Sequence, residues 1–129
     1  MLKDGKDLAV LSIGPIGHAA QTAIQKIESE GKATIAHFDM RFLKPIDTKL
    51  LDNIGERFDK IITLEDGTIN GGLGSAVIEY YSDNNLHPRV LRMGINDRFV
   101  EHGSTSELYN MLGLDAYGIE AQIRQLLNI

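Results

Sequence analysis

Five charged residues follow stretches of the sequence that are typical of buried strands. Their side chains are of types that could bind a ligand or another domain. They are Asp39, Arg41, Glu65, Asp66 and His102. In an open parallel sheet, the loops that leave the carboxyl ends of the strands emerge at one edge. We therefore expect the five side chains to gather at that edge as a charged surface for a ligand or another domain. A salt-bridged rim that faces solvent is the alternative.

His37 and Asp39 lie two residues apart on an expected strand, so they share a face and could ligate a metal if a third ligand converged on them. The sequence shows no such ligand, contains no cysteine and has no helix with two histidines four residues apart. We interpret His37 as a hydrogen-bonded histidine at a strand end and expect no metal site. Nucleophile elbows and Walker A lysines are also absent from the sequence.

A glycine cluster separates Glu65 and Asp66 from a helical pattern. Gly71, Gly72 and Gly74 permit positive φ angles or the close approach of other atoms. The cluster resembles a dinucleotide fingerprint only weakly, because the third position falls on Val77 and the cluster follows the third expected strand instead of the first. A structural turn is the favoured reading. The loop at residues 12–18 could likewise hold an anion at a helix start, but a plain connection is favoured.

Hydrophobic periodicity predicts strands alternating with helices. Apolar runs at residues 8–13, 33–38, 60–64 and 89–93 suit buried strands, while helical stripes cover 16–30, 48–58, 73–81 and a stretch from about 115. A further short helix is expected between Ser104 or Thr105 and Leu112. Gly31 is the expected C-cap of the first helix and Asp47 the N-cap of the second. Such alternation predicts parallel strands with helices on both faces of the sheet.

The composition is that of one domain covering residues 1–129. The chain has 43% hydrophobic residues, no cysteine and a net charge of −5. An acidic chain without a clustered basic face disfavours nucleic acid as a partner, and no apolar run reaches membrane-spanning length. No signal peptide pattern is visible at the N-terminus, so we expect a cytoplasmic protein.

Three motifs make the chain resemble a known family. They are DMRFLKPID at residues 39–47, TLEDGTINGGLGSAVIE at residues 63–79, and DRFVEHGS at residues 97–104 followed by GLDAYGI at residues 113–119. Together they resemble the C-terminal domain of the 1-deoxy-D-xylulose-5-phosphate synthases, within the transketolase superfamily. The resemblance extends from about Lys6 to the end of the chain.

The resemblance implies a three-layer α/β/α sandwich around a mostly parallel five-stranded sheet with one antiparallel strand. The residue pattern itself shows only four strands. Proteins of this family are transferases that condense pyruvate with glyceraldehyde 3-phosphate in isoprenoid biosynthesis, using thiamine diphosphate and a metal such as magnesium. Their cofactor lies between two earlier domains, and the motifs of those domains are missing here. The resemblance therefore implies no catalytic residue in this chain, because the matching motifs belong to the accessory domain.

The chain is thus expected to be a fragment that binds no cofactor by itself and packs on the catalytic domains of a parent enzyme, a homodimer when complete. Two alternatives stay open. One is the C-terminal domain of another transketolase-like enzyme, either a transketolase or a 2-oxoacid dehydrogenase β subunit. The other is a free-standing small α/β module that binds a ligand through its glycine-rich loop.

Overall fold

The computed structural model describes residues 2–40, 46–68, 72–95 and 114–129; for residues 66–68 and 95 it describes the backbone alone. Strands and helices alternate along these ranges. In chain order they are β1 (Leu8–Ile13), α1 (Ile16–Ser29), β2 (Ile35–Asp39), α2 (Thr48–Arg57), β3 (Lys60–Thr68), α3 (Leu73–Asp83), β4 (Arg89–Ile95) and α5 (Ala116–Leu127).

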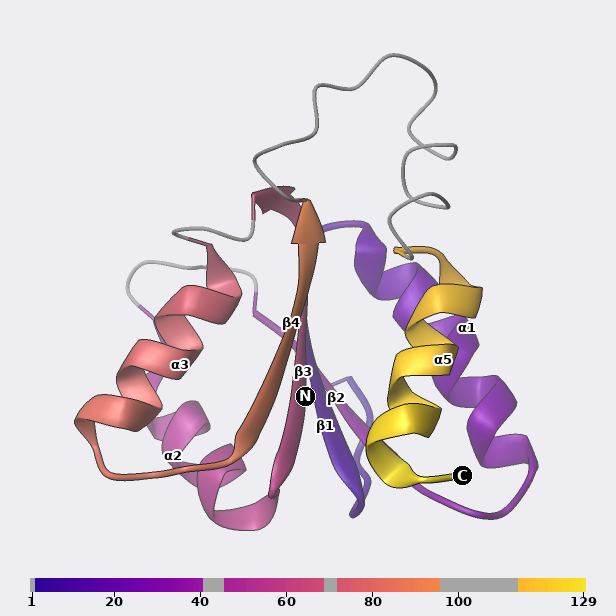
Figure 1. Cartoon of the computed structure of the whole chain (residues 1–129), viewed down its shortest axis with the longest axis horizontal. Coiled ribbons are helices and arrows are strands. Elements are labelled where there is room, and N and C mark those ends of the chain that lie inside the picture. The colour runs from indigo at the N-terminus through magenta and orange to yellow at the C-terminus, as the bar shows by residue number, and fades with distance from the viewer. Residues whose placement is uncertain (1, 41–45, 69–71, 96–113) are drawn as a thin grey trace.

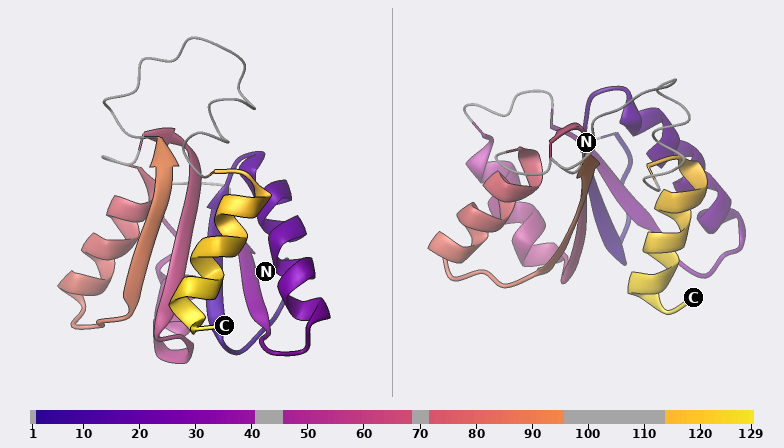
Figure 2. Two further views of the ribbon diagram at one scale, coloured as in Figure 1. Left: turned by 45° about the vertical axis from the view of Figure 1, so that its right-hand side comes forward. Right: turned by 45° about the horizontal axis from the view of Figure 1, so that its top comes forward.

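The four strands form one parallel sheet in the order β2-β1-β3-β4. Helices cover both faces, with α1 and α5 on one side and α2 and α3 on the other (Figure 1; Figure 2). This confirms the predicted α/β/α sandwich. The predicted fifth, antiparallel strand is not among the strands of the described residues, where Lys3 forms an isolated antiparallel bridge with His37 of β2.

The sandwich follows from the alternation of side chains along each strand. In β1, Leu8 and Val10 pack among residues of α1 and α5, while Ala9 and Leu11 pack among residues of α2 and α3. The sheet is therefore buried on both faces, which is why its strands are continuous apolar runs instead of alternating patterns.

The structure corrects some predicted boundaries. β2 starts at Ile35, two residues later than expected, and ends at Asp39. β3 continues through Glu65 and Asp66 to Thr68, with a register shift against β4 after Leu64. The two acids therefore belong to the strand and not to the turn that follows it. The short helix expected before Leu112 lies outside the described residues.

The predicted N-cap of α2 is confirmed, whereas the C-cap of α1 is Glu30, one residue before the predicted Gly31. The Asp47 carboxylate accepts a hydrogen bond from the Leu50 amide at 3.0 Å at the start of α2. Gly31 follows the C-cap of α1 with a φ of 74°, a left-handed conformation that glycine adopts without strain. None of the helices in the described ranges is both long and apolar enough to cross a bilayer.

Polar contacts join the helices within each layer. Arg124 of α5 donates two hydrogen bonds, of 2.9 and 2.7 Å, to the carboxylate of Glu30 at the end of α1. In the other layer, the Tyr81 hydroxyl of α3 donates to the Leu51 carbonyl of α2 at 2.8 Å. Burial raises the pKa of Tyr81, so this hydroxyl stays a donor at ordinary pH.

Candidate functional site

The direction of the chain reverses across the sheet between β1 and β3. In the sheet, β2 lies on one side of β1 and β3 lies on the other. The neighbours β1 and β3 are followed by helices on opposite faces of the sheet, α1 after β1 and α3 after β3 (Figure 1). In open α/β sheets, the carboxyl ends of such a strand pair form the usual place for a site. Ile13 is opposite Glu65 in this pair.

The five charged residues predicted for this edge have different positions. Asp39 is the last residue of β2, and Glu65 and Asp66 lie in β3. Arg41 and His102 are outside the described residues, as is the side chain of Asp66. Asp39 shares the strand face of His37, toward α1, whereas Glu65 points to α3. The structure thus places Asp39 and Glu65 at one edge but on opposite faces of the sheet.

Glu65 is buried, with 3% of its surface exposed, instead of forming part of a charged surface. One carboxylate oxygen accepts a hydrogen bond from the Leu73 amide at 3.0 Å, and the other accepts one from the Gly74 amide at 3.1 Å. These are the first amides of α3, which have no partner within the helix. The positive end of the helix dipole also favours a carboxylate here.

Gly74 allows this contact because the start of α3 lies close against the sheet. A Cβ atom at Gly74 would lie 2.5 Å from Cγ of Arg92 and 2.7 Å from Oγ1 of Thr63. Gly72 has a φ of −92°, outside the left-handed region, and Gly71 is not among the described residues. In the described part of the cluster, glycine is therefore required at position 74 because Thr63 and Arg92 approach its backbone closely, and not because of a positive φ.

The anion that binds at the glycine-rich turn is a side chain of the same polypeptide. The Glu65 carboxylate occupies the amides that would hold a phosphate in a dinucleotide or phosphate loop. A bound phosphate would have to displace a buried, doubly hydrogen-bonded carboxylate. The geometry therefore favours the structural turn over the nucleotide-binding reading. The sequence offers no local signal for this contact, because Glu65 and its partners are eight or nine residues apart.

A second buried polar pair lies under the start of α1. The Ser12 hydroxyl and Nε2 of His37 are 2.7 Å apart, with 2% and 3% of the residues exposed. Burial lowers the pKa of His37, while the negative charge of Asp39 partly opposes that shift. Gly17 leaves room for the pair, since a Cβ atom there would lie 3.1 Å from Oγ of Ser12. The prediction of a hydrogen-bonded histidine is confirmed, but its partner was not foreseen.

Two further observations concern metal ligands and hollows among the described residues. No group of three or more His, Asp or Glu side chains in those ranges is arranged to hold a metal ion. A hollow of about 260 Å³ lies where the end of α3 meets β4, and it is lined mainly by apolar residues: Ile78, Tyr81, Ser82, Leu86, His87, Pro88 and Val90. It lies at the amino end of β4, away from the carboxyl edge.

Removal of the Glu65 carboxylate should destabilise the domain. We expect Glu65→Ala to lower the free energy of unfolding by about 2 to 4 kcal/mol, because two buried amides lose their acceptors. Glu65→Gln should lose less, since it retains one acceptor. The measurement is urea unfolding followed by circular dichroism. Glu79→Ala, on the exposed face of α3, is the matched control and should be nearly neutral. Equal effects of Glu65→Ala and Glu79→Ala would contradict the capping role.

A side chain at Gly74 should push α3 away from the sheet. We expect Gly74→Ala to cost about 1 to 3 kcal/mol of unfolding free energy, because its methyl group overlaps Thr63 and Arg92. In the Thr63→Ala/Arg92→Ala background, which removes both obstacles, the same change should cost much less. Thermal and urea unfolding of the four proteins measure this coupling. An undiminished cost in that background would mean that the close approach is not the cause.

The buried His37 should make stability depend on pH. The unfolded chain binds a proton at His37 near the ordinary pKa of 6.5, whereas the folded protein does so only at lower pH. Stability is therefore full above pH 6.5 and falls below it, by at most about 1.4 kcal/mol per pH unit. His37→Gln should flatten this slope, and His87→Gln, at an exposed position, should not. Identical slopes in all three proteins would refute the assignment.

Comparison with known proteins identifies the family of this fold. The family model described as "Transketolase, C-terminal domain" matches residues 1–119. The 1-deoxy-D-xylulose-5-phosphate synthase of Bacteroides thetaiotaomicron is 56% identical over 114 residues, which are 88% of this chain and 18% of that protein. The synthase of Parabacteroides distasonis is 50% identical over 124 residues, 96% of this chain and 20% of that protein. The chain thus spans no more than 20% of the length of these relatives.

A solved structure agrees with this family. A protein described as "Split gene transketolase, inactive beta4 tetramer" matches 98% of this chain and 41% of its own, with a TM-score of 0.88 and 34% sequence identity. The observed parallel sheet and its two helical layers agree with the family match. The chain belongs to the transketolase C-terminal domain family.

Proposed function

We propose that this chain is the C-terminal accessory domain of a thiamine-diphosphate-dependent 1-deoxy-D-xylulose-5-phosphate synthase. Its role would be to pack on the catalytic domains and to support assembly of the homodimer, and it would not catalyse the reaction alone. The observation that carries this proposal is the high identity with 1-deoxy-D-xylulose-5-phosphate synthases over nearly the whole chain. The activity proposed for the complete enzyme is the condensation of pyruvate with glyceraldehyde 3-phosphate.

The geometry supports an accessory role. The glycine-rich helix start is filled by Glu65, and the described residues offer no metal-binding group. The amides at this helix start are thus already paired and do not fit the diphosphate group of thiamine diphosphate. We assign the cofactor and its magnesium ion to the other domains of the parent enzyme. When bound there, the thiamine ring would supply the carbanion chemistry of the condensation. This chain would contribute position and assembly.

The carboxyl edge of the sheet is the proposed contact surface. Asp39 lies there, and Arg41 is two residues farther along the sequence. Asp66 lies near the carboxyl end of β3, and His102 follows β4 in the sequence. We retain all four as candidates for contact with the catalytic domains. We propose a different role for Glu65, which fixes the position of α3 relative to β3 at this edge. Partly exposed ion pairs contribute little in isolation, so this surface should matter mainly in the assembled enzyme.

A complementation experiment tests the proposal. The 129-residue chain is mixed with separately prepared catalytic domains, and both association and formation of 1-deoxy-D-xylulose 5-phosphate are measured. We expect no turnover by the chain alone and activity from the mixture. Turnover by the isolated chain, or a mixture that neither associates nor reacts, would contradict the proposed role.

Arg41→Ala tests the contact surface within the same assay. We expect this variant to keep its melting temperature but to lose most of the complementation. Arg89→Ala is the matched control, because Arg89 is exposed at the first position of β4, at the opposite end of the strand. Equal activity of both variants would remove the carboxyl edge from the proposal.

The similarity to a split-gene transketolase makes another transketolase-like enzyme the second candidate. The same mixing assay separates the two when it is run with transketolase catalytic domains and a ketose donor. Activity in that mixture, with none in the synthase mixture, would favour the second candidate.

A further inference from the structure

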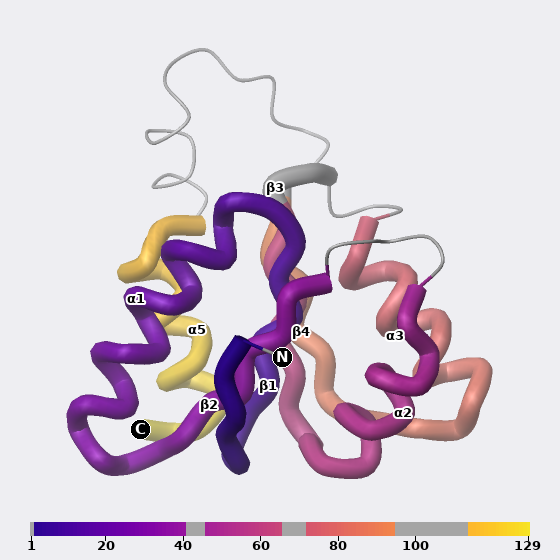
Figure 3. The backbone as a smooth tube through the Cα atoms, turned by 180° about the vertical axis from the view of Figure 1, so that it is seen from behind, coloured from indigo at the N-terminus to yellow at the C-terminus, as the bar shows by residue number. Residues whose placement is uncertain are grey.

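Residues 2–7 lie along the edge of β2 that faces away from β1 (Figure 3). The Lys3 carbonyl accepts a hydrogen bond from the His37 amide at 2.9 Å, and the Leu2 amide donates to the His37 carbonyl at 2.8 Å. Farther along, the Asp7 amide donates to the Thr34 carbonyl at 2.9 Å. The segment therefore runs antiparallel to β2 and covers its edge. We call residues 2–7 the N-terminal strap.

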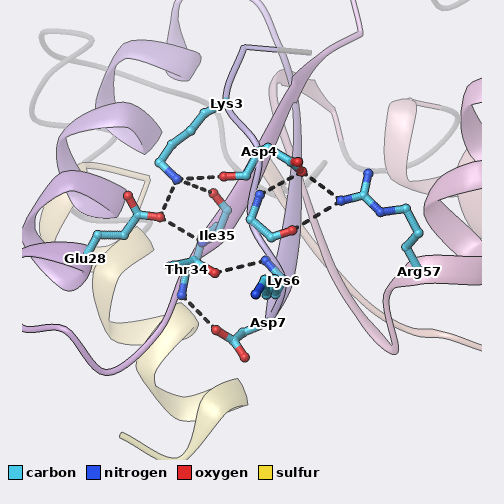
Figure 4. Close-up of polar contacts among 9 residues, drawn as sticks. Lys3, Asp4, Lys6, Asp7, Glu28, Thr34, Ile35 and Arg57 are labelled. Carbon is cyan, nitrogen blue, oxygen red and sulfur yellow. Dashed lines mark hydrogen bonds and ion pairs between the residues drawn. The ribbon is translucent and has the colours of Figure 1, made fainter.

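Side chains tie the N-terminal strap to both helical layers (Figure 4). Lys3 forms an ion pair with Glu28 of α1, and Glu28 also accepts a hydrogen bond from the Ile35 amide at 2.9 Å. On the other side, the guanidinium of Arg57 in α2 donates to the Asp4 carboxylate at 2.7 Å and to the Gly5 carbonyl at 3.3 Å. The strap thus connects α1, β2 and α2, three elements that do not follow it directly in the chain.

Gly5 lets the N-terminal strap lie directly on the backbone of β2. A Cβ atom at this position would lie 2.4 Å from the carbonyl carbon of Ile35 and 2.5 Å from the amide nitrogen of Ala36. Both obstacles are backbone atoms of a paired strand, so they cannot move aside as a flexible side chain does. Any residue other than glycine would hold the strap away from the sheet.

The pairing of the strap with β2 determines at which end of the sheet the strap begins. Leu2 and Lys3 lie beside His37, two residues before the end of β2, whereas Asp7 lies beside Thr34, before the strand begins. The strap therefore begins in the carboxyl half of the sheet, where Asp39 lies, and runs toward the amino ends of the strands. The Leu2 side chain is 58% exposed at this point.

We propose that the N-terminal strap is a docked linker that holds preceding domains in one orientation over the carboxyl edge of the sheet. This inference rests on the proposed function, in which cofactor-binding domains precede the chain. Flexible linkers are rich in glycine and serine and make few contacts. This strap instead forms backbone pairs, two ion pairs and a close contact at Gly5. A docked linker limits the orientations that the domains can sample, which raises the effective concentration of their contact surfaces.

Hydrogen exchange in the 129-residue chain tests whether the strap is docked. The His37 amide is the best reporter, because its acceptor is the Lys3 carbonyl. We expect slow exchange in the unaltered chain and at least about tenfold faster exchange in Gly5→Val. The amide of Ile62, inside the sheet, should stay protected and serves as the internal control. Fast exchange of His37 in the unaltered chain, or no change in Gly5→Val, would overturn the docking.

A milder variant covers the case in which Gly5→Val fails to fold. Arg57→Met removes the tie to Asp4 without inserting atoms between the strap and β2. It should also speed exchange at His37, although less than Gly5→Val. Arg89→Met is the matched control, because it removes an exposed arginine remote from the strap. The docking argument fails if the two arginine variants exchange alike.

The orienting role is tested in the complete enzyme by small-angle X-ray scattering and steady-state kinetics. With Gly5→Val or Arg57→Met we expect a larger radius of gyration and a lower kcat, while the cofactor is still bound by the other domains. Unchanged scattering and kcat would overturn the linker role. Protection of His37 in the 129-residue chain does not depend on any partner, so failed complementation with a protected His37 would refute the proposed function and not the docking.

Discussion

The buried carboxylate of Glu65 is the interaction on which the carboxyl edge of this domain depends. It joins the end of β3 to the first two amides of α3, and the glycine at position 74 brings the helix close enough for both bonds. A negative charge at 3% exposure is tolerable only with such partners. Because the carboxylate pairs with the first amides of α3, the glycine-rich turn has a structural role, which is to hold α3 against β3.

The two faces of the sheet are closed in a similar way near this edge. Glu65 lies under α3 on one face, and the Ser12–His37 pair lies under α1 on the other. Both arrangements use polar groups that are nearly inaccessible to solvent. The chemistry-bearing residues that the structure describes here therefore hold elements together. This agrees with a domain whose proposed contribution to an enzyme is a shaped contact surface and a docked linker.

Much of the fold was predictable because the signals for it are local. Continuous apolar runs at β1 and β3 indicated strands buried on both faces. Asp47 and Gly31 marked helix ends, Asp47 through a contact within three residues and Gly31 through its backbone angle. The end of β3 was missed because the strand continues there by pairing across the sheet, Glu65 with Ile13 of β1 and Thr68 with Ile95 of β4. A short-range pattern carries no information about such pairing.

The sequence by itself determined the alternation of strands and helices, the helix caps and the family motifs, since each depends on neighbouring residues. Only the tertiary structure decided that Glu65 is a cap and not a surface charge, that His37 bonds Ser12, and that Gly5 lies against Ile35. The partners of His37 and Gly5 are 25 and about 30 residues distant along the chain, and that of Glu65 lies across a turn. Their contacts exist because the packed layers bring the partners together, which residue type and spacing alone cannot specify.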